Sequence, residues 1–406
     1  MHHRVMVRVG AVLAVSALAL TACGSRSGDS GSGSTGGKIA KIGVIAPLSG
    51  DLSAIGQGIR DSVNLAIKQA NDAKAIPGWT LQLDDQDDQA NPDVGKNAAT
   101  KLASDNQVVA VVGTLNSSVA QNVQPVLSAA KVAEVSPANT NPSLTQGATW
   151  ATTKKRPYAN YFRTCTTDAV QGPFAARYVY NTLHLTKVAT VHDKKTYGQG
   201  LVQTFTEEFK KLGGTIVSAQ TINPDDKNYS AVVSKIKPSG PQLLYYGGEY
   251  PQSGPLTQQM KSAGLSIPLM GGDGMYSKDY LTLAGNAAPG NFATSVGAPL
   301  DQLPAAKKYV SDYTAGGYKG DNSSYGAYAF DAANAVIAAL KTSLANATDA
   351  KSARQATIDA LSKVSFAGVS GQVAFDQYGD TTNKTLTVYK VDGTAWKGVN
   401  TGEFKD

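Results

Sequence analysis

The sequence predicts an α/β protein built from two doubly wound parallel sheets. From residue 38 onward, short apolar runs alternate with helical patterns, and this alternation occurs in two successive series. The run Val108–Val112 is apolar at every position, which is typical of a parallel strand buried on both faces. With 406 residues, the chain is long enough for roughly two or three domains of about 150 residues each.

The first series begins with the apolar run Ile42–Ala46, a predicted strand that Pro47 ends. Apolar residues recur at helical spacing between Ile59 and Ala70. Asn91 followed by Pro92 is a helix cap with proline at the first helical position, so a helix is expected from there to residue 102. The other elements expected in this series are strands at 81–83, 108–112 and 132–135 and a helix at 117–130.

The second series has the same alternation. Strands are expected at 188–191, 215–219, 243–246 and 268–270, and helices at 168–184, 199–212, 229–236 and 256–263. Further helices are expected at 303–314, 324–345 and 350–363. The chain is then expected to end in a hairpin of Gln372–Phe375 and Leu386–Val391, with its turn residues at 378–380.

The N-terminal residues have the pattern of a secretion leader. Arg4 and Arg8 precede the apolar stretch Val9–Leu20, which is too short to span a bilayer but suits a signal peptide. The stretch ends in Leu20-Thr21-Ala22-Cys23, which resembles a bacterial lipobox, where the cysteine is acylated after cleavage. We therefore expect a signal peptide at 1–22, lipidation of Cys23 and a Gly/Ser tether to residue 37. The alternative is an ordinary secretory signal with an incidental cysteine.

Composition excludes several classes of protein. Only 17% of the residues are charged, and the formal net charge of +6 falls to +4 when the leader takes Arg4 and Arg8 with it. No run of five basic residues occurs, so nucleic-acid binding through a basic face is not expected. Cleavage also leaves two histidines and the single unmodified thiol of Cys165, which excludes an intramolecular disulfide and disfavours a transition-metal site. We expect no cofactor and no resident metal.

Polar residues follow the predicted strands. The loops after residues 46, 112, 135, 191, 246 and 270 are rich in Gly, Ser, Thr, Asn, Tyr and Asp. In open α/β sheets, ligands bind beyond the carboxyl ends of the strands. Backbone amides and short hydroxyls there suit a small polar or zwitterionic ligand.

Six motifs in these loops and their neighbours resemble those of the substrate-binding component of branched-chain amino-acid ABC importers. They are IGVIAPLSG (42–50), SPANT (136–140), QGPFAARYV (171–179), VHDKKTYGQG (191–200), YYGG (245–248) and MGGDG (270–274). The resemblance covers about residues 39–395 and implies the periplasmic binding protein type I fold, two lobes joined by a three-segment hinge. It implies lobe 1 at 38–164 and 294–370, and lobe 2 at 165–293 and 371–406.

The resemblance also implies ligand contacts. Ser117 matches a serine that holds the ligand carboxylate, and the helix that begins there would favour an anion; a plain N-cap serine is the simpler reading, compatible with that role. Ala138 and Thr140 match a pair that contacts the α-amino acid moiety, or else form a surface turn. Tyr197 matches a tyrosine of lobe 2 that closes over the ligand.

Two aspartates are candidates for the ligand ammonium. Asp273 matches the acidic residue of the family that pairs with it, although a turn aspartate in Gly-Gly-Asp-Gly would explain the same sequence. Asp168 is a second candidate for the ammonium or an interlobe contact, with a helix cap as the alternative.

Two positions depart from the family pattern. Glu249 stands where the family has a tyrosine that contacts the ligand carboxylate, and Tyr250 is a candidate to replace the lost donor. Ile55 and Asn116 replace an aromatic residue and a half-cystine, which points to a wider or more polar side-chain pocket.

The function expected from these observations is capture of leucine, isoleucine or valine by a monomeric, extracytoplasmic lipoprotein. Its partners would be the permease subunits of an ABC importer and, through the lipid on Cys23, the cell membrane. The alternative keeps the fold but binds an amide, urea or a basic amino acid, or senses a ligand. An enzyme is not expected, because G-x-S-x-G, P-loop and C-x-x-C motifs are absent. Asp84–Asp88 contains an acidic run but lacks the glycine and closing glutamate of an EF-hand.

Overall fold

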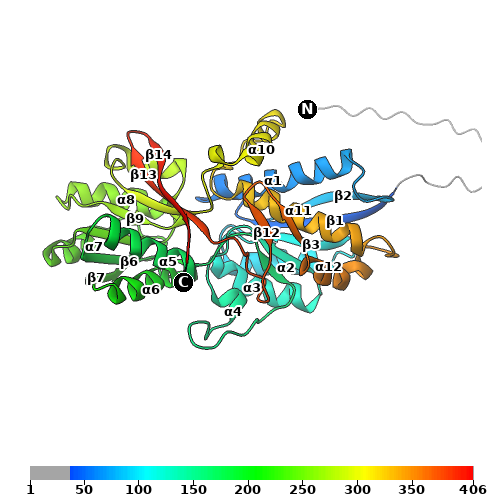
Figure 1. Cartoon of the computed structure of the whole chain (residues 1–406), viewed down its shortest axis with the longest axis horizontal. Coiled ribbons are helices and arrows are strands. Elements are labelled where there is room, and N and C mark those ends of the chain that lie inside the picture. Colours follow the sequence, from blue (N-terminus) through cyan, green and yellow to red (C-terminus); the bar gives the residue numbers. More distant parts are fainter. Residues whose placement is uncertain (1–36, 406) are drawn as a thin grey trace, which may run out of the picture. The chain divides into compact units, whose positions relative to one another are not determined.

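Two separate sheets organise residues 37–405, the part of the chain that this computed structural model describes (Figure 1). One sheet has five strands and the other has seven, and a small two-stranded sheet accompanies them. We call the five-stranded sheet with its helices lobe 1, and the seven-stranded sheet with its helices lobe 2. The predicted fold class is thereby confirmed.

The sheet of lobe 1 is entirely parallel, with the spatial order β2-β1-β3-β4-β5. Its strands are β1 (Lys38–Ala46), β2 (Trp79–Asp87), β3 (Val108–Gly113), β4 (Ala133–Ser136) and β5 (Tyr161–Arg163). Every residue of β3 is buried, as its unbroken apolar sequence predicts.

Helices cover both faces of this sheet, so that alternate strand residues join different cores. Ile42 and Val44 pack into the core beneath α1 and α11, whereas Ile45 joins a second core with residues of α2 and α3. The helices of lobe 1 are α1 (Ser53–Asp72), α2 (Pro92–Ser104), α3 (Ser117–Ala129), α4 (Ser143–Gln146), α10 (Pro304–Ala315), α11 (Gly326–Ser343) and α12 (Arg354–Leu361).

The sheet of lobe 2 has the order β14-β13-β10-β9-β8-β6-β7. Its five parallel strands are β6 (Lys187–His192), β7 (Thr215–Thr221), β8 (Leu243–Gly247), β9 (Leu269–Gly271) and β10 (Phe292–Val296). The antiparallel strands β13 (Thr385–Asp392) and β14 (Ala395–Glu403) extend it at the β10 edge. Its helices are α5 (Asp168–Arg177), α6 (Thr196–Lys211), α7 (Ser230–Ile236), α8 (Tyr250–Ser262) and α9 (Lys278–Ala284).

The chain passes between the lobes three times. It crosses first between β5 and α5, then between β10 and α10, and finally on the way into β13. Two predicted lobe boundaries fall near strands: 293/294 lies inside β10, and 370/371 lies just before β12 (Gln372–Ala374), which pairs with β11 (Ser365–Ala367). Figure 1 shows α11 and α12 beside the strands of lobe 1, and β13 and β14 on lobe 2, where they form one edge of the sheet.

The predicted C-terminal hairpin is wrong. Residues 372–374 pair with β11, and the residues expected to be their partner lie in β13, between β10 and β14. The tight turn of the real hairpin contains Asp392 and Gly393, and Gly393 has a φ of 60°, a conformation that glycine adopts without strain. The expected turn at 378–380 exists, but it closes only an isolated bridge between Phe375 and Thr381.

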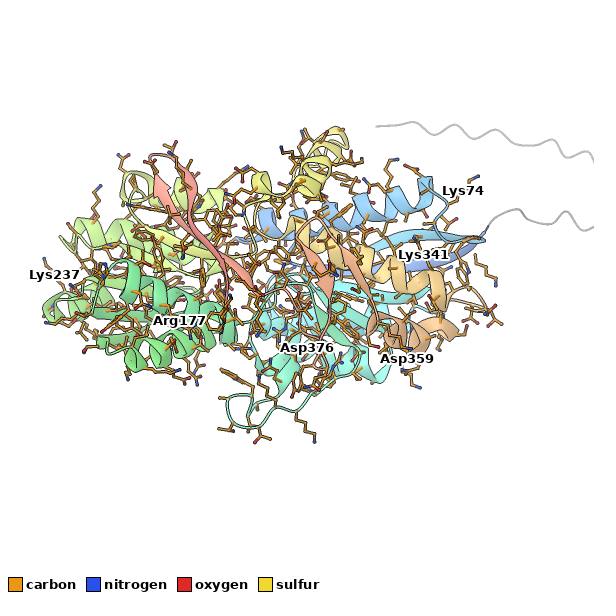
Figure 2. All side chains as sticks on the ribbon, in the orientation of Figure 1. Lys74, Arg177, Lys237, Lys341, Asp359 and Asp376 are labelled. Carbon is orange, nitrogen blue, oxygen red and sulfur yellow. The ribbon has the colours of Figure 1, made fainter. Side chains whose placement is uncertain are left out.

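The leader, Cys23 and nearly all of the tether lie outside the described residues, so the structure does not test the predicted signal peptide and lipidation. Among residues 37–405, no helix has both the length and the apolar character needed to cross a bilayer. Cys165 is buried, and burial raises the pKa of its thiol. Charged side chains are spread over the described part, with Lys237 and Lys74 far apart and Lys341 on the same lobe as Asp359 (Figure 2).

Candidate functional site

The strand-end loops of the two lobes meet around a small cavity. Its volume is about 20 Å³, room for about one water molecule. Residues from both lobes line it: Leu52, Ile55, Leu115, Asn116, Ser117, Ala138, Tyr197, Glu249, Gly274 and Tyr325. Four of the predicted site residues, Ser117, Ala138, Tyr197 and Glu249, are in this wall. The other three, Thr140, Asp168 and Asp273, are buried and reach it through hydrogen-bonded neighbours.

Ser117 lies at the N-terminal end of α3, facing the cavity. Asn116 is the N-cap residue, so Ser117 is the first helical residue and the interpretation as a plain N-cap serine is wrong. The Ser117 hydroxyl accepts a long hydrogen bond from the Asn141 N–H at 3.4 Å. The Asn116 carbonyl is taken by the N–H groups of Val119 and Ala120. The earlier N–H groups of the helix, together with its dipole, therefore favour an anionic group in the cavity.

Asp273 lies behind the cavity wall, where three neutral groups donate hydrogen bonds to it. Its Oδ1 accepts hydrogen bonds from the Tyr197 hydroxyl at 2.7 Å and from Gln171 Nε2 at 2.9 Å. Its Oδ2 accepts a hydrogen bond from the hydroxyl of Tyr325, a lobe-1 residue, at 2.7 Å. The side chain is completely buried. Asp273 is therefore more than a turn residue, because its carboxylate links three elements of the fold.

Asp168 is the second buried carboxylate of this region. Its Oδ1 accepts a 3.3 Å hydrogen bond from Gln171 Nε2, the same group that donates to Asp273. Its Oδ2 has no hydrogen-bond partner, and neither has the Thr140 hydroxyl. The N-cap of α5 is Thr167, so the helix-cap alternative for Asp168 is wrong. The Asp168 N–H donates instead to the Thr140 carbonyl, at 2.8 Å.

Burial disfavours the ionised form of both carboxyl groups unless a cation lies beside them. Burial raises the pKa of Asp273, against the opposing effect of hydrogen bonds from Tyr197, Tyr325 and Gln171. Burial, and then the nearby Asp273 carboxylate, raise the pKa of Asp168 well above its ordinary value. Within residues 37–405, no salt bridge joins either group to a lysine, arginine or histidine. An ammonium group bound between them would supply the missing charge.

Glu249 lines the cavity beside the N-terminus of α3. One carboxylate oxygen accepts a hydrogen bond from Asn116 Nδ2 across the lobes at 2.8 Å, and the other lies 3.0 Å from Lys195 Nζ. Burial and the Glu249 carboxylate raise the pKa of neighbouring Asp193 to about 8. Tyr250 does not replace the lost donor, because its hydroxyl donates to the Asp51 carbonyl at 2.6 Å.

Several residues of the site were not predicted. Tyr325 and Gln171 both hold Asp273, and Lys195 neutralises Glu249. Gln171 and Lys195 lie inside two of the motifs that carry the family resemblance, QGPFAARYV and VHDKKTYGQG, so a signal for them was present. Tyr325 had no such signal, since only folding brings it to a residue 52 positions earlier in the chain.

Hydrogen bonds across the cavity hold the two lobes together. Besides Asn116 to Glu249 and Tyr325 to Asp273, Asn141 Nδ2 donates to the Thr196 carbonyl at 2.9 Å. Ser324 donates to the Tyr276 carbonyl. The structure thus represents a closed arrangement, in which polar groups of one lobe bind carboxylates and carbonyls of the other.

Comparisons with known proteins agree with this geometry. The sequence profile described as "Periplasmic binding protein" matches residues 40–397. The Leu/Ile/Val-binding protein homolog 3 of Brucella melitensis is 31% identical over 351 residues, covering 86% of this chain and 91% of the relative.

Solved structures with the same fold differ in their ligands. A branched-chain amino acid transporter substrate-binding protein from Streptococcus pneumoniae, in complex with isoleucine, has a TM-score of 0.79 and 26% identity, covering 91% of this chain and 99% of that one. An ABC transporter solute-binding protein from R. palustris, in complex with 4-hydroxybenzoate, also has a TM-score of 0.79, at 20% identity and with 91% and 98% coverage. The profile match spans most of the chain, and the chain belongs to the periplasmic binding protein family.

Proposed function

We propose that the chain is the extracytoplasmic substrate-binding lipoprotein of an ABC importer, and that it captures leucine, isoleucine or valine by closing its lobes. The observation that carries the proposal is the charge pattern of the site. Two buried carboxyl groups without a cationic partner, Asp168 and Asp273, lie behind the cavity wall, and the N-terminus of α3 forms part of that wall. An α-amino acid carries an ammonium and a carboxylate that match these two features.

Hinge closure supplies the affinity. Micromolar binding needs about −8 kcal/mol, which for a ligand of leucine's size is close to 1 kcal/mol per heavy atom and near the upper limit for small ligands. Only burial on all sides, with both charges paired by bonds worth roughly 1.5–3 kcal/mol each, reaches that value. Because the closed cavity holds only about 20 Å³, the lobes must separate to admit an amino acid. The permease would then distinguish the closed form from the open one.

The names of the relatives support an amino acid as the ligand. The Brucella melitensis relative is named as Leu/Ile/Val-binding, and the Streptococcus pneumoniae structure contains isoleucine. Apolar side chains of Leu52, Ile55 and Leu115 in the cavity wall suit an aliphatic side chain. These observations favour leucine, isoleucine and valine over other amino acids.

A panel of the twenty amino acids tested by thermal shift, followed by calorimetry, tests the ligand. We expect saturable one-to-one binding of leucine, isoleucine or valine. Binding of no amino acid in the panel would reject this substrate class. Labelling cells with a palmitate analogue tests the anchor separately: the wild-type chain should be labelled, and the Cys23→Ala variant should not.

One observation favours a second candidate ligand class. Glu249 presents a carboxylate to the cavity, while its partner Lys195 is not part of the cavity wall. A ligand whose second polar group donates hydrogen bonds, such as an amide, urea or a basic amino acid, would meet Glu249 without repulsion. Replacing Glu249 by tyrosine should then shift the ligand profile toward aliphatic amino acids, and an unchanged profile would remove the support for this candidate.

A further inference from the structure

A buried arginine organises the loop that carries two of the candidate ligand-binding residues. Arg163, the last residue of β5, is completely buried. Its Nη1 donates to the carbonyls of Asn139 at 2.6 Å and Asn141 at 3.0 Å, and its Nη2 donates to the Thr145 hydroxyl. One guanidinium group therefore hydrogen-bonds to the backbone carbonyls of the residues on both sides of Thr140.

The same guanidinium is paired with an acid from a distant part of the chain. Arg163 Nε lies 2.6 Å from Asp380 Oδ1, and Asp380 is 5% exposed. The other oxygen of Asp380 accepts a hydrogen bond from Gln146 Nε2 at 2.7 Å. The backbone N–H of Arg163 also donates to the Gly379 carbonyl, at 2.9 Å. Side-chain and backbone bonds thus fasten residues 379–380 to the end of β5 and to the end of the loop that carries Thr140.

The position of this pair in the chain connects it with domain closure. Arg163 lies shortly before the first crossing between the lobes, and Asp380 lies shortly before the third. The Thr140 carbonyl, between the two carbonyls that Arg163 binds, accepts the N–H of Asp168 at the far side of the first crossing. The three consecutive carbonyls at 139–141 are therefore fixed from lobe 1 and from the start of lobe 2.

We propose that Arg163 and Asp380 are positioning residues. They hold the loop that carries Thr140 in a fixed position relative to the segments where two hinge crossings begin. Closure then brings Thr140 and Asp168 to the ligand in one defined geometry. The ligand-binding part of this inference rests on the proposed function, because it takes Thr140 and Asp168 to contact the ligand. The anchoring of the loop does not depend on it.

Two variants test the pair, and a third is a matched control. Asp380→Asn keeps the shape of the side chain but removes its charge. Arg163→Lys keeps the charge but cannot bind both carbonyls and the hydroxyl together. The control is Arg354→Lys: Arg354 is also a buried arginine of lobe 1, 4% exposed, and it donates to the carbonyls of Ala103, Asp105, Val108 and Ala130, away from the crossings.

Hydrogen exchange on the unliganded proteins provides the first readout, and it requires no ligand. We expect amides of residues 136–146 to exchange at least tenfold faster in either test variant, while those of β3 keep the wild-type rate. Arg354→Lys should leave residues 136–146 unchanged. Unchanged exchange of that loop in both test variants would overturn the proposal, and the second variant decides if the first does not fold.

Leucine affinity, measured by calorimetry well below the melting temperature, provides the second readout. We expect a Kd at least tenfold weaker in Asp380→Asn, and a Kd within twofold of wild type in Arg354→Lys even if the melting temperature falls as much. A purely structural pair would lower the melting temperature without changing Kd, and that outcome would contradict a positioning role. If wild type binds none of leucine, isoleucine and valine, the proposed ligand class is wrong, and the exchange result alone decides whether the pair anchors the loop.

Discussion

At the scale of single residues, the site depends on buried carboxylates with unequal surroundings. Asp273 accepts three hydrogen bonds from neutral donors, whereas Asp168 keeps one oxygen without a partner. The neutral donors make ionisation of Asp273 possible, but they do not neutralise it. A bound cation is the partner that both carboxylates lack, and the Asp273 carboxylate is the one already oriented for it.

Replacing Asp273 by asparagine should weaken amino-acid binding while preserving the fold. Asparagine keeps the size of the side chain but removes the charge, so a charge-assisted hydrogen bond worth roughly 1.5–3 kcal/mol is lost. The Kd from calorimetry should rise roughly 10- to 150-fold. Asp88→Asn is the matched control, because Asp88 is equally buried but accepts its hydrogen bond from the Ala90 N–H and not from residues of the site. An unchanged Kd in Asp273→Asn would contradict the ammonium role.

Asp88 should make the stability of the fold depend on pH. Burial raises its pKa to about 7, far above the value of an exposed aspartate. Between these two pKa values the folded state binds more protons than the unfolded state. The contribution of Asp88 to the free energy of unfolding is therefore most favourable below about pH 4 and is lost as the pH rises through about 7. The loss approaches a limit on the order of 2–4 kcal/mol.

Urea denaturation of wild type and Asp88→Asn between pH 5 and 9 measures this contribution. The difference in the free energy of unfolding between the two proteins should shift in favour of the variant as pH rises. A difference that stays constant over this range would show that the Asp88 carboxyl does not titrate as expected.

Part of the site could be predicted from the sequence. The strand ends pointed to the loops, the family resemblance singled out Ser117, Tyr197 and Glu249 within them, and all three line the cavity. Tyr250 was misassigned because its neighbour Glu249 points into the cavity, whereas the Tyr250 hydroxyl binds Asp51 in the opposite lobe. Such a contact depends on the closure of the lobes, and no spacing within the sequence encodes it.

At the scale of elements, the site depends on close packing between strand ends and helix starts. Gly198 in α6 and Gly247 at the end of β8 face one another, and a Cβ added to either would overlap the carbonyl oxygen of the other. This contact sets the position of the first turn of α6, which carries Tyr197. The two glycines therefore have a packing role that turn chemistry alone does not reveal.

Gly198→Ala should destabilise lobe 2 by about 1–3 kcal/mol, because the new methyl group also meets the Asp193 carboxylate. Thermal denaturation measures the effect. Gly402→Ala is the control: the nearest atom to its added Cβ is Phe174 Cε2 at 4.0 Å, and its stability should stay within about 0.5 kcal/mol of wild type. Equal stabilities of the two variants would refute the packing argument.

The sequence identified those elements whose apolar pattern is strong. The fully buried strands β3 and β8 and the amphipathic helix α1 were all predicted. β5 was missed because it is only three residues long. β14 forms the edge of its sheet, and most of its residues are exposed. It was missed because its sequence does not alternate between apolar and polar residues. The correct partner of β13 then could not be found.

At the scale of the whole molecule, the lobes are held closed by bonds between groups that a ligand would also use. Asn116 binds Glu249, and Tyr325 binds Asp273. Each bond joins one lobe to the other, and each ends on a carboxylate of the proposed site. Closure without ligand and closure around a ligand therefore compete for the same carboxylates.

Removing both donors should shift the unliganded protein toward an open form. The double variant Asn116→Ala and Tyr325→Phe should have a larger radius of gyration in small-angle X-ray scattering than wild type. Tyr309→Phe is the control, because the Tyr309 hydroxyl bonds with Ser62 within lobe 1. If the double variant and the control scatter alike, these two bonds do not hold the lobes closed.

The small volume of the cavity has a consequence for the rate of binding. With room for about one water molecule, the closed form cannot admit an amino acid, so each ligand must wait for the lobes to part. At low concentration the observed rate constant in a stopped-flow experiment rises with the amount of ligand. At high concentration it levels off at the opening rate of the unliganded protein, the signature of conformational selection. The speed of binding at high ligand concentrations is then set by the bonds that hold the empty protein shut.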